Sequence, residues 1–148
     1  MIALGSDHAG FPLKVVVKEY LDQNNIEYKD FGTDSTASCD YPIFAQAVAE
    51  AVVNGEADRG ILICGTGIGI SIAANKVPGI RAALCGDVFS AKFTRRHNDA
   101  NILAMGARVT GPGLALEIVD AFLNNEFEGN QHLRRINEIA DIEKKYSK

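Results

Sequence analysis

The sequence of 148 residues has no tryptophan and few cysteines, only Cys39, Cys64 and Cys85. Cysteines at these spacings form neither a disulfide framework nor a zinc-binding motif. Long apolar runs are also absent, because no stretch approaches the roughly 20 residues that a membrane-spanning helix needs. The N-terminus lacks a basic segment, and Asp7 and His8 interrupt its short apolar run, so it does not have the form of a secretory signal. We therefore expect a reduced, cytoplasmic protein.

Basic residues are also fewer than acidic ones. The chain has 15 Lys and Arg against 19 Asp and Glu, which gives a formal net charge of −4. Without a basic run, neither nucleic acid nor an anionic membrane is an expected partner. At 47% hydrophobic and 23% charged residues, the composition is that of a globular protein rather than a disordered one. A chain of this length normally forms one domain, so we expect a single domain over residues 1–148.

Short apolar runs alternate with segments of helical periodicity along the chain. The runs that predict strands occupy residues 2–6, 26–31, 59–64, 80–84 and 102–105. The segments that predict helices between them begin near Gly10, Pro42, Ser71, Asp87 and Gly111. Such alternation predicts an α/β fold with a five-stranded, mostly parallel sheet covered by helices on both faces. A last amphipathic helix over about 130–146 needs a further surface to pack against.

In a parallel sheet, ligands bind at the carboxyl ends of the strands, and a glycine-rich loop follows the third predicted strand there. The glycines of Gly65-Thr66-Gly67-Ile68-Gly69 permit positive φ, and the backbone N–H groups can converge on an anion. The loop is not a Walker motif, because no Gly-Lys-Ser/Thr follows. It is not the dinucleotide fingerprint either, because Ile70 stands at that motif's third glycine. A tight strand-to-helix turn without a ligand would have the same pattern.

Cys64 directly precedes this loop, where a thiol faces the positive end of a helix. That position favours a thiolate that acts as nucleophile or base, although a buried structural cysteine is the alternative. Cys85 also follows a strand but lacks such a loop, and Cys39 lies in a polar segment. We interpret both of these as structural.

The three histidines, His8, His97 and His132, lie far apart in sequence, and we therefore expect no metal site. His8 follows Asp7 at the first strand end, in a pair too polar to be buried without partners. His97 ends a helix within a cationic cluster that could simply compensate the helix dipole. Arg134 and Arg135 have an equally simple interpretation as the solvated face of the last helix.

Five motifs, taken together and in order, resemble the type B ribose-5-phosphate isomerases. That family also contains galactose-6-phosphate isomerase subunits and allose-6-phosphate isomerases. The motifs are Ser6-Asp7-His8-Ala9-Gly10, Asp40-Tyr41-Pro42, Cys64 with the glycine loop, His97-Asn98-Asp99-Ala100-Asn101 and Met105-Gly106-Ala107-Arg108. The resemblance implies a Rossmann-like three-layer α/β/α sandwich and a metal-free, cofactor-free isomerase of the pentose phosphate pathway. It also implies a homodimer, or a tetramer, in which the segment around His97 meets the cysteine loop of the partner and the last helix covers the partner.

The resemblance further implies catalytic roles. Cys64 would be the base that moves a proton between C2 and C1 of ribose 5-phosphate through a cis-enediolate, giving ribulose 5-phosphate. Thr66 would shuttle a proton between O1 and O2, and His97, with Asp99 near it, would open the sugar ring. Asp7 would orient hydroxyl groups.

Other residues are implied to bind the substrate. These are His8, Tyr41, Gly65, Gly67, Gly69, Asn98, Arg108 and Arg135. The loop amides would hold the enediolate oxygens, and the two arginines with His8 would hold the phosphate. One position departs from the family, because Gln131 stands where an arginine is usual. Gln131 could still donate a hydrogen bond to the phosphate, and either Arg134 or His132 would replace the missing charge, or the phosphate would be held with less positive charge.

The departure leaves a six-carbon sugar phosphate open as the substrate, either allose 6-phosphate or galactose 6-phosphate. A non-catalytic phosphate-binding module is a different class, but it would have no use for the thiol of Cys64. A purely structural dimerisation domain would leave Asp7, His8 and His97 unexplained.

Overall fold

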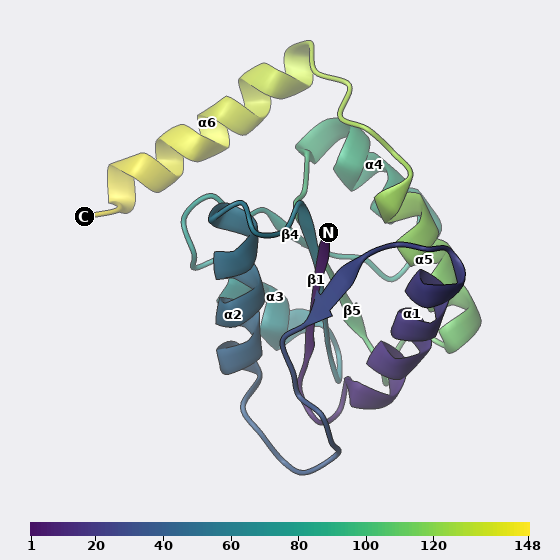
Figure 1. The fold of residues 1–148 in the computed structure, drawn as a ribbon. Coiled ribbons are helices and arrows are strands. Elements are labelled where there is room, and N and C mark those ends of the chain that lie inside the picture. Colours follow the sequence, from purple (N-terminus) through teal and green to yellow (C-terminus); the bar gives the residue numbers. More distant parts are fainter.

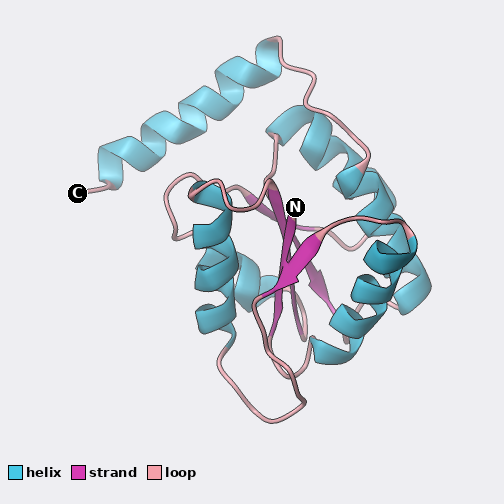
Figure 2. Ribbon diagram, viewed as in Figure 1, coloured by secondary structure: helices cyan, strands magenta, loops and turns pink.

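The computed structural model describes residues 1–148, which form one five-stranded sheet and six helices (Figures 1 and 2). The strands are β1 (Ile2–Ser6), β2 (Tyr28–Asp30), β3 (Arg59–Cys64), β4 (Ala82–Leu84) and β5 (Ile102–Gly106). The helices are α1 (Phe11–Gln23), α2 (Tyr41–Val53), α3 (Ile68–Ala74), α4 (Val88–Asn98), α5 (Pro112–Leu123) and α6 (Gln131–Tyr146). The strand order is β2-β1-β3-β5-β4, and every neighbouring pair is parallel.

The sheet lies between two helical layers, with α2 and α3 on one face and α1, α4 and α5 on the other (Figure 1). Its central strand β3 is buried on both faces, since Ile61, Leu62 and Ile63 are all fully inaccessible. Ile61 and Ile63 face the α1/α5 side and Leu62 faces the α2/α3 side, as the alternation of a strand requires. The expected three-layer α/β/α sandwich is confirmed.

The boundaries differ from the sequence-based expectations in three places. The strands expected over 26–31 and 80–84 shrink to three residues each, because Ile26 and Ile80 pack into the core outside the hydrogen-bonded ladder. The helix expected over 71–75 already begins at Ile68, because Gly67 adopts φ 80° and turns the chain directly into it. The helix expected to begin near Asp87 does begin there, and Asp87 is its N-cap, since its carboxylate accepts a hydrogen bond from the Ser90 N–H at 2.6 Å.

One edge strand, β4, has its outer side occupied by a side chain. The Asn75 carboxamide oxygen accepts from the backbone N–H of Ala82 at 2.8 Å, and its amide nitrogen donates to the Ala82 carbonyl at 3.0 Å. Asn75 thus satisfies both backbone groups that Ala82 turns away from β5.

The last helix, α6, extends from the rest of the chain as an arm (Figures 1 and 2). Within it only His132 and Ile136 are buried. Four large apolar side chains of this helix are exposed, namely Leu133, Ile139, Ile142 and Tyr146. The expectation that this helix packs on a partner subunit stays a prediction. None of the six helices is long and apolar enough to cross a membrane.

Candidate active site

Cys64 is the last residue of β3 and is 5% exposed. Its sulfur accepts a hydrogen bond from the backbone N–H of Gly67 at 3.1 Å, which the positive φ of that glycine makes possible. The Thr66 side chain points out of the turn, and its hydroxyl oxygen accepts from the N–H of Ile68 at 3.2 Å. The loop therefore places a thiol, a hydroxyl and backbone donors together at the carboxyl end of the central strand.

The turn after β5 fixes the position of this loop. The N–H groups of Ala107 and Arg108 donate to the carbonyls of Cys64 and Gly65 at 2.9 and 3.0 Å. Gly106 lies so close to Thr66 that a Cβ at that position would be 2.5 Å from the Thr66 carbonyl carbon. The Arg108 guanidinium reaches over the loop, with Nη1 3.4 Å from where a Cβ on Gly65 would be. A cation is thus held beside the glycine turn.

The aromatic ring of Tyr41, at the start of α2, covers the other end of the loop. A Cβ on Gly69 would lie 2.7 Å from the Tyr41 Cζ atom, so only glycine leaves room for the ring. Tyr41 is 39% exposed, and its position is consistent with a pocket-lining role.

Asp7 and His8 lie beside the same loop, since the N–H of Asp7 donates to the Ile63 carbonyl at 3.3 Å. The buried Asp7 carboxylate accepts from the Gly10 N–H at 2.9 Å and so organises the start of α1. The His8 Nδ1 accepts from the Cys39 N–H at 3.2 Å, which puts the ring proton of neutral His8 on Nε2. Cys39, interpreted as structural from the sequence, therefore orients His8 through its backbone.

Cys85 is 2% exposed, and burial raises the pKa of its thiol to about 11. Such a thiol stays protonated near neutral pH, which agrees with a structural role.

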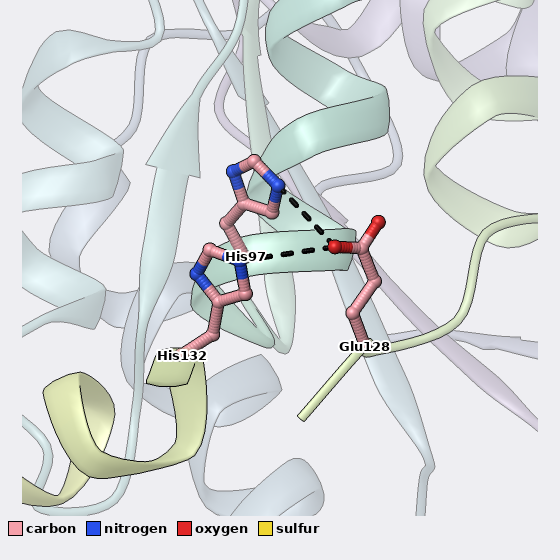
Figure 3. Close-up of side chains that lie close together, drawn as sticks. All are labelled: His97, Glu128 and His132. Atoms are coloured by element: carbon pink, nitrogen blue, oxygen red, sulfur yellow. Dashed lines mark ion pairs between the residues drawn. The ribbon is translucent and has the colours of Figure 1, made fainter. Parts of the chain in front are cut away.

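A second group of side chains gathers at the C-terminal end of α4. The rings of His97 and His132 stack with centroids 4.0 Å apart and planes 9° from parallel (Figure 3). The Glu128 Oε1 atom lies 3.5 Å from the Nε2 of His97 and 3.7 Å from the Nε2 of His132. The end of α4 thus meets the segment between α5 and α6, and the start of α6, around one carboxylate.

Glu128 is the residue that sequence reasoning missed. The sequence paired His97 with Asp99, but the Asp99 carboxylate binds Arg95 at 2.8 Å and faces Arg81 at 3.5 Å. The spacing of four residues between Glu128 and His132 is the signal that could have pointed to it. Asn98 is exposed beside His97 at the end of the helix.

The same three side chains are the only group that could hold a metal ion, with ligand atoms within 4.8 Å of one another. Nearly parallel imidazoles, however, do not point their nitrogen lone pairs at one ion about 2 Å away. At least one ring would have to rotate before His97 and His132 could bind the same metal.

Arg135 and Gln131 are exposed on the first turns of α6, and Arg135 makes no ion pair within the chain. Arg134 pairs with Glu138 at 3.8 Å, along the helix surface. None of these three side chains contacts the cysteine loop of its own chain.

The cysteine loop and the His97 group lie at opposite ends of the sheet. Cys64 pairs with Gly106 at the carboxyl end of β5, whereas His97 ends α4 shortly before β5 begins at Ile102. A strand of five residues spans about 16 Å. One chain therefore cannot bring His97 to Cys64.

Comparisons with known proteins agree with this architecture. Residues 2–139 match the model of a family described as ribose/galactose isomerase. The chain is 51% identical to ribose-5-phosphate isomerase B of Escherichia coli, with 97% of each chain covered. It is 46% identical to D-erythrulose-4-phosphate isomerase of Pectobacterium atrosepticum, covering 96% of this chain and 94% of that one. The structure of ribose-5-phosphate isomerase B from Clostridium thermocellum superimposes with a TM-score of 0.97 at 57% identity, with 99% of each chain covered. The chain therefore belongs to the ribose/galactose isomerase family, and it is an enzyme of the sugar phosphate isomerase type.

Proposed function

We propose that this enzyme interconverts ribose 5-phosphate and ribulose 5-phosphate without a metal ion. The observation that supports this most directly is the thiol of Cys64, which ends β3 and accepts a hydrogen bond from the Gly67 N–H. An aldose–ketose isomerase needs a base at carbon and donors for the oxygens that become negative, and this loop supplies both.

In the proposed reaction the Cys64 thiolate removes the proton from C2 of the open-chain aldose. The electron pair forms the C1–C2 double bond and the electrons of the C1 carbonyl move onto O1, which gives a cis-enediolate. Thr66 passes a proton from O2 towards O1, and the C2–O2 carbonyl forms as Cys64 returns its proton to C1. Atoms and charge balance, so no oxidant or metal is required.

The cyclic form of the aldose must open before this step. In the proposal His97 protonates the ring oxygen as the bond from C1 to that oxygen breaks, while the C1 hydroxyl gives up its proton to solvent. Asp7 and Asn98 orient the hydroxyl groups, and Tyr41 lines the pocket. His8 and Arg108 bind the phosphate together with Arg135, because a guanidinium matches phosphate oxygens.

The active site is proposed to form between two copies of the chain. His97 and Arg135 lie at the end of the sheet opposite Cys64, so a second chain must supply them to the cysteine loop. Exposed apolar side chains beside that loop and on the neighbouring elements support such an interface, namely Ile68, Leu84, Phe89 and Val109. The exposed face of α6 would also be covered by the second copy. The pentose phosphate pathway and the cytoplasm are the setting that this activity implies.

Ketose formation from ribose 5-phosphate by EDTA-treated protein tests the activity. We expect turnover by the wild type and loss of turnover in Cys64→Ala, with sugar phosphate binding retained. Cys64→Ser should be nearly as inactive, because an alcohol is far less acidic than a thiol. Unchanged turnover in Cys64→Ala would show that another group is the base.

Mixing two inactive variants tests the shared site. Cys64→Ala and His97→Ala chains, unfolded together and refolded in equal amounts, form mixed dimers with one intact site each. Random pairing then restores about one quarter of wild-type activity. A mixture as inactive as its parents would refute a site built from two chains.

A six-carbon sugar phosphate is the second candidate, and Gln131 is the observation that favours it. A glutamine can donate a hydrogen bond to phosphate but adds no positive charge. Turnover of allose 6-phosphate or galactose 6-phosphate, with none of ribose 5-phosphate, would support this alternative.

A further inference from the structure

Glu128 is tied to the end of α4 through its backbone and through both carboxylate oxygens. Its N–H donates to the carbonyl of Arg96 at 3.0 Å, and its Oε2 lies 3.7 Å from the Arg96 guanidinium. The other oxygen, Oε1, faces the two imidazoles. Glu128 therefore has one oxygen committed to a permanent cation and one directed at His97.

The segment that holds Glu128 is itself anchored to two helices. The Asn125 side chain donates to the Ala121 carbonyl at 2.7 Å and accepts from the Arg96 Nε at 3.1 Å. The Asn125 carbonyl accepts from the buried Arg95 at 3.4 Å. The linker between α5 and α6 is thus fastened to the last turn of α4, which is the turn that ends in His97.

The His97 ring is held on both sides. His132 stacks on one side with centroids 4.0 Å apart, and Phe93 packs at 5.0 Å and 57°. The Nε2 of the ring faces Glu128, so the opposite nitrogen, Nδ1, is directed away from the carboxylate (Figure 3). Glu128 and Arg96 are the charged groups on this cluster, and His132 is its second imidazole.

We propose that Glu128 is a positioning residue that keeps a proton on Nε2 of His97 and so assigns the mobile proton to Nδ1. In ring opening the imidazolium gives its Nδ1 proton to the ring oxygen as the bond from C1 to that oxygen breaks, and the C1 hydroxyl loses its proton to solvent as the C1 carbonyl forms. Neutral His97 then retains the Nε2 proton beside Glu128. This inference rests on the ring-opening role of His97 in the proposed function.

The geometry favours positioning over a contribution to stability. His97 is 38% and Glu128 is 40% exposed, and ion pairs in such surroundings contribute little to the free energy of unfolding. A carboxylate that faces a histidine instead selects the tautomer and orientation of the ring, as in other acid–base sites.

The experiment compares Glu128→Gln and Glu128→Asp with Glu126→Gln as the matched control. Glu126 lies on the same linker, but its side chain is 84% exposed and pairs with Arg59 at 3.5 Å. Three measurements are made, namely steady-state kinetics with ribose 5-phosphate for kcat and KM, exchange of the C1 proton of ribulose 5-phosphate in D₂O, and the ¹⁵N shifts of His97. Ribulose 5-phosphate has no furanose form, so its exchange reports the Cys64 step alone.

For Glu128→Gln we expect kcat with ribose 5-phosphate to fall on the order of 10-fold, with KM unchanged. The fall is smaller than the full contribution of general acid catalysis, because His97 itself remains. In the same variant, C1 exchange should stay near the wild-type rate, and the His97 ¹⁵N shifts should show a larger fraction of the Nδ1–H tautomer. Glu128→Asp should recover part of the lost kcat. Glu126→Gln should match the wild type in all three measurements.

A wild-type kcat in Glu128→Gln would overturn the inference, as would an equal fall in kcat and C1 exchange. Unchanged ¹⁵N shifts would also overturn it. A wild type that shows no isomerisation of ribose 5-phosphate would instead overturn the proposed function. In that case the ¹⁵N shifts alone decide whether Glu128 sets the His97 tautomer.

Discussion

Replacing Gly106 with alanine should push the cysteine loop away from β5. The added Cβ would lie 2.5 Å from the Thr66 carbonyl carbon and 2.6 Å from its oxygen, whereas ordinary contacts begin at 3.4 Å. The backbone must therefore move by about 0.9 Å, because no flexible side chain can absorb the overlap. Overpacking of this kind costs about 1–3 kcal/mol of unfolding free energy. A displacement near 1 Å of catalytic groups lowers kcat on the order of 10²-fold.

Steady-state kinetics with ribose 5-phosphate and urea unfolding measure the two effects. Gly113→Ala is the matched control, because a Cβ there meets nothing within 4 Å and the position lies in the first turn of α5. That variant should keep its kcat and gain about 0.5–1 kcal/mol, as alanine is favoured over glycine in helices. Full activity in Gly106→Ala, or the same loss in both variants, would refute the reasoning.

Three further predictions concern buried ionisable groups. Lys14→Met should lower the free energy of unfolding by about 3 kcal/mol in urea titrations, because it leaves the partly buried Asp30 carboxylate without the Lys14 ammonium 2.6 Å away. Burial alone would raise the pKa of Asp30, but hydrogen bonds from Lys14, Gly32 and Lys18 outweigh it and hold the pKa below its usual value. The contribution of Asp30 to the free energy of unfolding should therefore be complete above about pH 4 and lost as the pH falls further. In Lys14→Met, the free energy of unfolding should fall less on acidification than in the wild type. Iodoacetamide at pH 8 should leave Cys85 unlabelled in native protein and label it in urea, as mass spectrometry will show, because burial raises its pKa to about 11.

The sequence predicted secondary structure correctly in segments where a single physical effect, such as burial on both faces of a sheet, determines the residue pattern. The continuous apolar run Ile61–Ile63 predicts a central strand, because only a strand covered on both faces buries every side chain. The same reasoning was wrong at the sheet edges, where apolar residues are buried without being hydrogen-bonded into a strand. Ile26 and Ile80 are apolar for the core and yet lie outside the ladder, so the pattern extended two strands too far.

Within the site, the cysteine loop could be read from the sequence because its parts are adjacent in the chain. Contacts between distant segments could not. Glu128 lies 31 residues after His97, and the Cys39 backbone meets His8 across the same separation. The periodicity of a helix or strand relates only residues within one element. Residues such as these are brought together by the path of a linker or loop. The pairing of Asp99 with Arg95 follows the helical spacing of four residues, which the family pattern alone did not reveal.

The side chain of Asn75 occupies backbone groups at one edge of the sheet to which another strand could otherwise add. Exposed sheet edges offer unpaired N–H and C=O groups to which a foreign strand can add. On β4 the carboxamide of Asn75 already imitates such a strand by binding both backbone groups of Ala82. The opposite edge, β2, is three residues long and includes the charged Lys29 and Asp30. Neither edge is suited to fibril-like growth, so an interface between copies of this chain would use side-chain contacts rather than extend the sheet.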